Sequence, residues 1–280
     1  MRKSQKLLRG SVFHILVIGF GLFMIYPLLW MVFSTFKENR EIFGTASLWP
    51  EHFSLDSYAR GWAGVGGTPF ATFFRNSFYY VILATIGTVL SSALVAYGFG
   101  RIKFAGKKFW FACMLLTMML PYQIVMIPQF ILFFKIGWAN SFKPLIVPMF
   151  AGQPFFIFLM IQFIRGLPVE LDESAKIDGC GRFGIFTRII FPLITPALIT
   201  STIFQFYWRW DDFLGPLLYL NKPTMYTVSL ALRMFADPMT TTDWGGMFAM
   251  GTLSLVPILV VFLIFQKYLV EGIATTGIKG

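Results

Sequence analysis

The sequence is poor in charged residues, which make up only 13% of its 280 positions. A soluble globular domain carries about 25% charged residues, so the composition excludes an ordinary water-soluble protein. Hydrophobic residues make up 56% of the chain, aromatic residues make up 19%, and the mean hydropathy is +0.69. This amount of apolar side chain also excludes a disordered protein and indicates that a membrane surrounds much of the surface.

Cysteine and histidine are scarce, and no nucleotide-binding motif is present. Cys113 and Cys180 cannot form the framework of a disulfide-rich secreted domain, and with two histidines at unrelated positions they do not indicate a zinc site. The Gly-Lys pair at 106–107 is followed by lysine where a P-loop needs Ser or Thr. Residues 179–184 fit G-x-G-x-x-G, but they follow a helix-like segment and not a strand. The sequence therefore predicts no metal ligands and no catalytic residues, and it assigns any nucleotide chemistry to another chain.

Six stretches without Asp, Glu, Lys or Arg are long enough to cross a membrane, which takes about 20 apolar residues. They predict transmembrane helices at approximately residues 11–35, 76–100, 109–133, 144–164, 190–208 and 245–266. The next longest uncharged gap, residues 61–74, is short and rich in glycine, so we expect a loop there. The predicted fold is an all-α integral membrane protein whose residues 1–280 form a single transmembrane domain with six spans.

Basic residues are distributed unequally between the two sides of the predicted membrane. The two termini and the second and fourth connections hold 14 of the 23 Lys and Arg residues. Because basic residues are retained in the cytoplasm, both termini are predicted to be cytoplasmic, and the net charge of +10 indicates orientation rather than nucleic-acid binding. The basic start, followed by a long apolar stretch without a small-residue cleavage site, predicts an uncleaved anchor in the cell membrane.

The predicted spans contain no acidic or basic residue, which disfavours two classes of membrane protein. Gradient-driven carriers and intramembrane enzymes usually keep ionisable side chains in the bundle interior. His14 lies near the cytoplasmic end of the first span and is interpreted as a packed or interfacial residue. Pro121 and Pro128 interrupt the third span, and Pro27 and Pro257 lie in the first and sixth. These prolines predict either simple kinks or helices that bend around a translocation path.

The fourth connection, residues 165–190, has the pattern of two short helices around a glycine turn. Pro168 suits a first helical position, acidic residues follow it, and Gly179 is placed to end the first helix. Asp172 and Lys176 have the spacing of an i,i+4 ion pair, and each helix has an apolar face. The pattern fits an amphipathic elbow on the membrane surface, and it equally fits a docking surface for a cytoplasmic partner.

This loop resembles that of the permease subunits of binding-protein-dependent ABC importers, and among them the carbohydrate permeases of the maltose-permease type. The family motif is Glu-Ala-Ala, three residues, Gly, nine residues and Ile-x-Leu-Pro, which corresponds here to Glu173-Ser174-Ala175, Gly179 and Ile189-Ile190-Phe191-Pro192. Ser174 stands where the motif has alanine and Phe191 where it has leucine, and both are modest departures. The resemblance extends over nearly the whole chain, through Arg75-Asn76-Ser77, Pro121, Ile127-Pro128, Trp210-Asp211-Asp212-Phe213 and Gly277-Ile278-Lys279-Gly280.

The resemblance implies a permease that is coupled to a separate ATPase subunit dimer, which binds ATP and Mg. In such importers the loop helix lies in a cleft of the ATPase, and ATP-driven closure switches the spans between inward-facing and outward-facing states against a second, homologous permease chain. An extracytoplasmic solute-binding protein would deliver the carbohydrate, which by likeness is an oligosaccharide. The implied ATPase contacts are Glu173, Ser174, Ala175, Asp178 and Gly179 in the coupling loop, and Lys279 and Gly280 in the C-terminal tail.

Among these contacts, Glu173 is expected to make a charge-assisted contact with the ATPase, and Ala175 and Gly179 to permit close approach. A frayed terminus is the alternative interpretation of the tail.

The segment 206–212 combines aromatic and planar polar side chains, which are the two kinds of group that recognise sugars. Trp208, Trp210, Asp211 and Asp212 are therefore candidates for the substrate pathway. The same segment also fits an aromatic belt at the outer membrane boundary with internal ion pairing.

Overall fold

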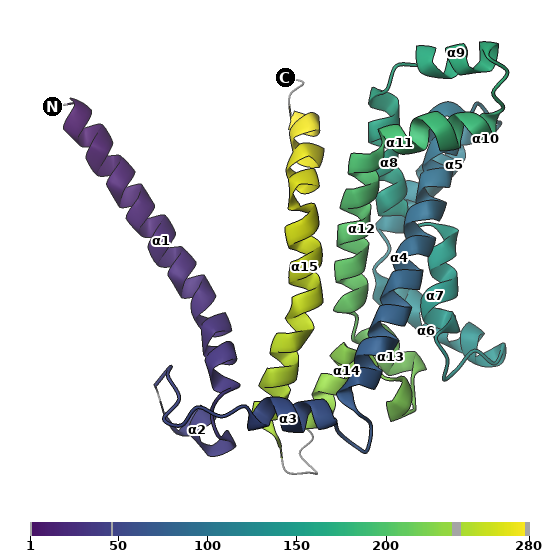
Figure 1. The fold of residues 1–280 in the computed structure, drawn as a ribbon. Coiled ribbons are helices and arrows are strands. Elements are labelled where there is room, and N and C mark those ends of the chain that lie inside the picture. Colours follow the sequence, from purple (N-terminus) through teal and green to yellow (C-terminus); the bar gives the residue numbers. More distant parts are fainter. Residues whose placement is uncertain (1, 46, 237–241, 278–280) are drawn as a thin grey trace. The chain divides into compact units, whose positions relative to one another are not determined.

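The computed structural model describes residues 2–45, 47–236 and 242–277 (Figure 1). Across these ranges the chain is helical, and the extended pairing is limited to an isolated bridge between Val65 and Thr68. The chain divides into two compact units, which are described separately here. Unit 1 consists of Met1–Ala71 and Leu232–Leu255, and unit 2 consists of Thr72–Ala231 and Val256–Gly280.

Several helical stretches are long and apolar enough to cross a membrane. Four of them pass this test as continuous stretches: Gly10–Ser34, Phe70–Arg101, Lys143–Gly166 and Trp244–Lys267. Two bent helix pairs bring the number to six if each pair is one span: Lys107–Met118 with Tyr122–Lys135, bent by 98°, and Arg182–Leu193 with Thr195–Trp210, bent by 75°. The prediction of an all-helical integral membrane protein is confirmed.

Proline explains both bends. Pro121 lies between α5 (Lys107–Met118) and α6 (Tyr122–Lys135), where it has no amide hydrogen to continue a helix and disfavours the helical conformation of the residue before it. The second bend follows α11 (Phe191–Leu193) and precedes α12 (Thr195–Trp210), which carries a proline in its first turn. Other prolines do not end a helix, since α1 (Arg2–Ser34), α6 and α15 (Trp244–Gly277) continue through theirs.

Unit 1 contains α1 and two short helices, α2 (Asn39–Gly44) and α3 (Asp56–Ala63), together with η4 (Arg233–Ala236) and the first turns of α15. Aromatic rings hold these pieces together, because Phe43 of α2 packs edge-on against Trp244 at 5.3 Å between ring centroids. Trp30 contacts Phe248 in the same way at 5.4 Å. The contacts of α1 and α2 with the start of α15 therefore rely on aromatic packing. The Arg60–Asp243 ion pair adds a contact between α3 and the residue before α15.

Unit 2 holds most of α4 (Phe70–Arg101), the helices up to Ala231, and the C-terminal part of α15. Its elements after α6 are α7 (Lys143–Ile146), η1 (Val147–Ala151), α8 (Pro154–Gly166), α9 (Glu170–Ile177), α10 (Arg182–Ile185), η2 (Phe186–Ile190), α11, α12, α13 (Leu214–Tyr219), η3 (Pro223–Met225) and α14 (Val228–Leu232). In Figure 1 the helices α4, α8 and α12 run side by side, and α9 lies across one end.

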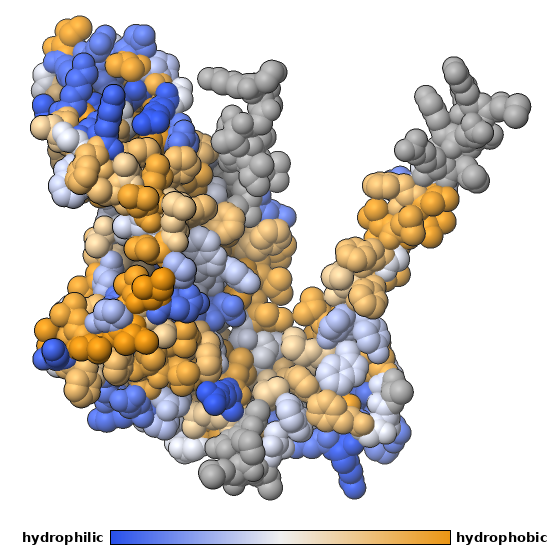
Figure 2. All heavy atoms as spheres, turned by 180° about the vertical axis from the view of Figure 1, so that it is seen from behind, coloured by the Kyte–Doolittle hydropathy of each residue, from blue (hydrophilic) through white to orange (hydrophobic). Residues whose placement is uncertain are grey.

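The core of unit 2 forms along one face of α4. Ala84, Thr88, Ser92 and Ala96 are buried on this face, and small side chains there allow neighbouring helices to approach closely. Gly100 shows how close this approach is, because a Cβ atom there would lie 2.6 Å from the side chain of Ile164 in α8. The outer sides of the bundle are hydrophobic, whereas hydrophilic side chains gather at the end that holds α9 (Figure 2). This distribution is the one expected of a membrane-embedded bundle.

Candidate functional site

The coupling loop begins where α8 ends, and a glycine fixes its shape. Gly179 has φ +80°, a left-handed conformation that favours glycine. The amide of Cys180 donates to the carbonyl oxygen of Ala175 at 2.9 Å, and that of Gly179 donates to the carbonyl oxygen of Lys176 at 3.0 Å. These two bonds form a Schellman motif, so α9 ends where the sequence predicted.

A buried ion pair holds α9 against the end of α4. Arg101 Nε lies 3.4 Å from Asp172 Oδ2, and both side chains are only 7% exposed. Arg101 Nη2 also donates to the carbonyl oxygens of Leu167 at 2.8 Å and Pro168 at 3.2 Å. The predicted pairing of Asp172 with Lys176 is therefore wrong, because Arg101, 71 positions earlier, takes the place of the helical neighbour.

The outer surface of α9 carries most of the residues assigned to ATPase coupling. Glu173, Ser174, Asp178 and Gly179 are exposed, and the neighbouring Ile177 is 87% exposed. Ala175 differs from them, since its side chain is buried in the hydrophobic core of unit 2 and supports the helix from inside. The predicted tail contacts, Lys279 and Gly280, lie outside the described residues.

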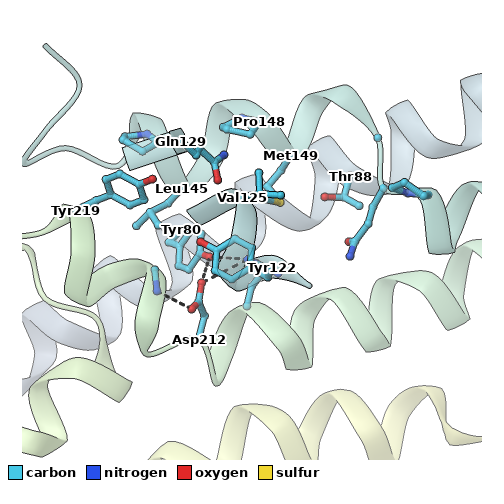
Figure 3. Close-up of a pocket in the computed structure, with 16 residues that line it drawn as sticks. Tyr80, Thr88, Tyr122, Val125, Gln129, Leu145, Pro148, Met149, Asp212 and Tyr219 are labelled. Carbon is cyan, nitrogen blue, oxygen red and sulfur yellow. Dashed lines mark hydrogen bonds and ion pairs between the residues drawn. The ribbon is translucent and has the colours of Figure 1, made fainter. Parts of the chain in front are cut away.

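A cavity of about 440 Å³ lies inside unit 2, among α4, α6, α7, η1, α8, α12 and α13. We call it the tyrosine cavity, after the three tyrosines that border it: Tyr80, Tyr122 and Tyr219. Figure 3 shows Tyr80 and Tyr122 close to Asp212, with Tyr219 near Gln129 and Leu145 and with Thr88 farther along. Seven separate elements thus border one space, and α4, α6, α12 and α13 bring polar or aromatic side chains to it.

A hydrogen-bonded ion pair forms one wall of the tyrosine cavity. Tyr80 Oη donates to Asp212 Oδ2 at 2.7 Å, and Arg209 Nη1 lies 3.4 Å from the same oxygen. Arg209 Nη1 also donates to Tyr80 Oη at 3.3 Å, and the amide of Gly215 donates to Asp212 Oδ1 at 3.0 Å. Arg209 is 22% exposed and Asp212 is 16% exposed. The wall therefore holds one positive and one negative charge within hydrogen-bonding distance.

Three buried polar atoms of the cavity residues have no hydrogen-bond partner among the described residues: Gln153 Oε1, Arg209 Nε and Tyr219 Oη. Burial also raises the pKa of Tyr219 to about 12, so its hydroxyl stays protonated and able to donate at physiological pH. An unsatisfied buried polar group costs about 1–3 kcal/mol. Each of these atoms therefore needs a further partner, which a water molecule or a polar ligand can supply.

The predicted substrate-pathway residues have divided between two environments. Only Asp212 of the four borders the cavity. Trp210 is buried and stacks on Phe206 at 5.7 Å, and Trp208 packs against Phe156 at 5.3 Å. Asp211 is exposed. Trp210 is thus part of the core, and Trp208 is partly buried against it.

Sequence reasoning missed most of the cavity. Tyr80 is brought to Asp212 by folding alone, and Gln129 and Gln153 lie in predicted spans that contain no charged residue. One available signal was the presence of uncommon glutamines inside apolar stretches. Polar side chains at bilayer depth are costly and usually face the bundle interior.

The comparisons with known proteins agree on one family. Residues 89–275 match the family described as "Binding-protein-dependent transport system inner membrane component". The chain is 35% identical over 256 residues to the probable ABC transporter permease protein YurM of Bacillus subtilis, covering 91% of this chain and 84% of that one. It is 32% identical to the multiple sugar-binding transport system permease protein MsmG of Streptococcus mutans, covering 100% of both chains. It is 30% identical to the trehalose/maltose transport system permease protein MalG of Thermococcus litoralis, covering 95% of this chain and 96% of that one.

A solved structure shares the fold. A chain of a bacterial ABC transporter involved in the import of the acidic polysaccharide alginate superposes with a TM-score of 0.85. The match covers 94% of this chain and 97% of that chain at 19% identity.

Proposed function

Because this chain belongs to the family of binding-protein-dependent transport system inner membrane components, we propose that it is a transmembrane permease subunit of an ATP-driven carbohydrate importer. It is a multi-pass protein of a prokaryotic plasma membrane and a transport subunit rather than an enzyme. The permeases of sugar importers among its relatives support carbohydrate as the cargo, and an oligosaccharide is the proposed form. The chain would form half of the translocation pathway, and a second homologous permease would form the other half.

The proposed topology has six spans with both termini in the cytoplasm. The four continuous apolar stretches and the two bent pairs support this number. The basic residues support the orientation, because 14 of 23 would lie on the cytoplasmic side together with α9. The tyrosine cavity would then lie among the helices of the membrane domain.

The single observation that carries the coupling role is the way α9 is mounted. Its outer surface is exposed, while Asp172 and Arg101 fasten its inner side to the end of α4. A force applied to the exposed side of α9 would therefore reach a long helix of the bundle through a buried contact. We propose that a separate ATPase dimer, which binds ATP and Mg, applies this force when it closes, and that Glu173 makes a charge-assisted contact with it.

The proposed partners outside the membrane follow from the family. Its description names dependence on a binding protein, and a solved relative of the same fold is in complex with an alginate pentasaccharide-bound periplasmic protein. We propose that a solute-binding protein delivers carbohydrate to this chain and its permease partner, and that the ATPase drives the release to the cytoplasm.

The test is transport in proteoliposomes that contain this chain, its partner permease, the ATPase and the binding protein. Glu173→Lys should abolish most binding-protein-stimulated ATP hydrolysis and uptake, and it should weaken retention of the ATPase during purification. The matched control is Asp56→Lys, which reverses an exposed acidic charge in the first turn of another eight-residue helix, α3. Unchanged hydrolysis and uptake in Glu173→Lys would return the loop to a passive surface role.

A further inference from the structure

The tyrosine cavity has the size and chemistry of a carbohydrate site, and this chain holds it within one compact unit. We propose that the tyrosine cavity binds one neutral sugar ring of the transported carbohydrate, so that this chain contacts the cargo directly. The inference rests on the proposed function. It adds where the cargo binds in this chain, and it adds that the bound sugar ring is uncharged.

The first support is the set of buried polar atoms that lack partners. Tyr219 at the end of α13 and Gln153 just before α8 line the cavity, and Tyr219 Oη and Gln153 Oε1 have no hydrogen-bond partner among the described residues. Sugar hydroxyls both donate and accept hydrogen bonds, so they would satisfy a phenol and an amide at once. A lipid tail cannot form hydrogen bonds, so it would leave these atoms unsatisfied. Because an unsatisfied buried polar group is costly, a lipid tail is a poor occupant of the cavity.

The second support is the mixture of flat and apolar surfaces. Tyrosine rings border the cavity beside proline, leucine and methionine side chains. Such surfaces suit the C–H face of a sugar ring, while a few polar groups fix its orientation. The volume of about 440 Å³ lies within the range of about 300–1,000 Å³ that is usual for small-ligand pockets.

The third support concerns charge. Arg209 and Asp212 are the charged residues of the cavity lining, and each neutralises the other at 3.4 Å. The remaining polar groups are hydroxyls and amides. An acidic sugar needs an unbalanced positive charge to pair with its carboxylate, whereas the charge of Arg209 is balanced by Asp212 at 3.4 Å. The cavity therefore suits a neutral ring.

The experiment uses the complete importer in proteoliposomes with four radiolabelled probes: maltose, diacetylchitobiose, arabinotriose and an alginate trisaccharide. Tyr219→Phe and Gln153→Leu remove one polar group each and keep the side-chain size. The control is Tyr207→Phe, which removes an exposed hydroxyl on α12 outside the cavity.

Uptake of a neutral probe below saturation should fall about three- to tenfold in Tyr219→Phe and Gln153→Leu, which corresponds to the loss of one hydrogen bond. ATP hydrolysis stimulated by the binding protein should stay within about twofold of wild type, and Tyr207→Phe should match wild type in both assays. If Tyr219→Phe fails to assemble with the ATPase, Gln153→Leu and Gln129→Leu decide the result.

The outcomes separate the two proposals. If the wild type imports a probe and both cavity variants take it up as fast as Tyr207→Phe does, the cavity assignment is overturned and the proposed function stands. Import of the alginate trisaccharide as fast as the neutral probes overturns the charge assignment. A wild-type importer that takes up none of the four probes, and whose ATPase ignores the binding protein, overturns the proposed function and the inference together.

Discussion

Unit 2 contains two arginine–aspartate pairs with the same separation and different surroundings. Arg101–Asp172 and Arg209–Asp212 each have their charged atoms 3.4 Å apart. The first pair is almost fully buried, and two backbone carbonyls accept hydrogen bonds from its arginine. The second pair is more exposed, and both pairs border a cavity, of about 290 Å³ at the first and about 440 Å³ at the second.

The comparison shows that the role of an ion pair depends on its burial and on the groups that contact it. Arg101 binds Asp172 of α9 and the backbone carbonyls of Leu167 and Pro168, so this pair holds the loop against the end of α4. Arg209 and Asp212 both bind Tyr80 at the border of the tyrosine cavity, so this pair belongs to the surface that we propose contacts the cargo. Removing a partner should therefore chiefly damage stability and coupling at the first pair, and selectivity at the second.

The largest effect is expected from Asp172→Ala, which leaves the buried Arg101 guanidinium without its counter-charge. Breaking a buried pair in this way costs about 3–5 kcal/mol. Thermal unfolding of the purified importer should shift to lower temperature, and the ATPase should be lost during purification. Asp178→Ala, at an exposed acid near the end of the same helix, should change stability by less than about 0.5 kcal/mol. An equal thermal shift in the two variants would contradict the bracing role of the buried pair.

A smaller effect on stability is expected from Asp212→Asn, which keeps the shape of the side chain and removes its charge. Hydrogen bonds to charged groups contribute about 1.5–3 kcal/mol, so stability should fall by about 2 kcal/mol. Arg209 would then be uncompensated, and uptake of an alginate trisaccharide should rise relative to neutral sugars. Asp211→Asn removes an exposed charge at the next position and is the control for both measurements. If the ratio of alginate trisaccharide uptake to neutral sugar uptake stays the same in Asp212→Asn, the pair has no role in cargo binding.

Gly179→Ala tests the loop geometry while the buried ion pair stays intact. A Cβ atom would meet nothing within 4 Å, so the cost is that of a left-handed conformation alone, about 1–2 kcal/mol. We expect weaker ATPase retention on a pull-down with little loss of folded protein. Gly166→Ala, at the last residue of α8, also meets nothing within 4 Å and has no positive φ, so it should be neutral or slightly stabilising. If both variants retain the ATPase equally, the shape of the turn does not matter for docking.

The smallest effect is expected at Arg60–Asp243 in unit 1, where the side chains are 48% and 26% exposed. Partial burial opposes ionisation of Asp243, but hydrogen bonds from Arg60, the Gly246 amide and Asn39 together hold the pKa of this carboxyl below its usual value. Its stabilising contribution is therefore complete above about pH 4 and is lost as the pH falls through the lowered pKa. An exposed pair of this kind contributes about 0.2–1 kcal/mol.

Thermal unfolding from pH 6 to pH 2.5 tests this contribution. The wild type should lose slightly more stability below pH 4 than Asp243→Asn does. Parallel curves would show that the pair is fully screened.

Much of the fold could be predicted because hydropathy acts locally. A run without charges marks an apolar helix wherever it ends up, so the apolar stretches of α1, α4 and α15 were found from residue type alone. The bend at Pro121 was also foreseeable, since proline breaks a helix through its own backbone. The end of α9 at Gly179 followed from the freedom of one residue.

The bend in the fifth predicted span did not follow from hydropathy. The uncharged run predicted one helix over 190–208, whereas α11 and α12 meet there at an angle of 75°. Prolines lay in the run, but their effect depends on the elements around them, because α1 and α15 continue through proline without ending. Hydropathy measures how apolar a segment is, and it does not fix the direction in which that segment runs.

The sequence by itself determined that this protein is a helical membrane protein, that its basic residues favour one side, and that residues 165–190 form a two-helix loop with the motif of its family. These properties depend on the residues of one segment at a time. The tertiary structure decided that Arg101 pairs with Asp172 and that Tyr80, Arg209 and Asp212 meet beside a cavity. The Arg101–Asp172 pair and the contacts of Tyr80 with Arg209 and Asp212 join positions about 70 to 130 residues apart. They form because burial makes an unpaired charge or hydroxyl costly enough to select its partner.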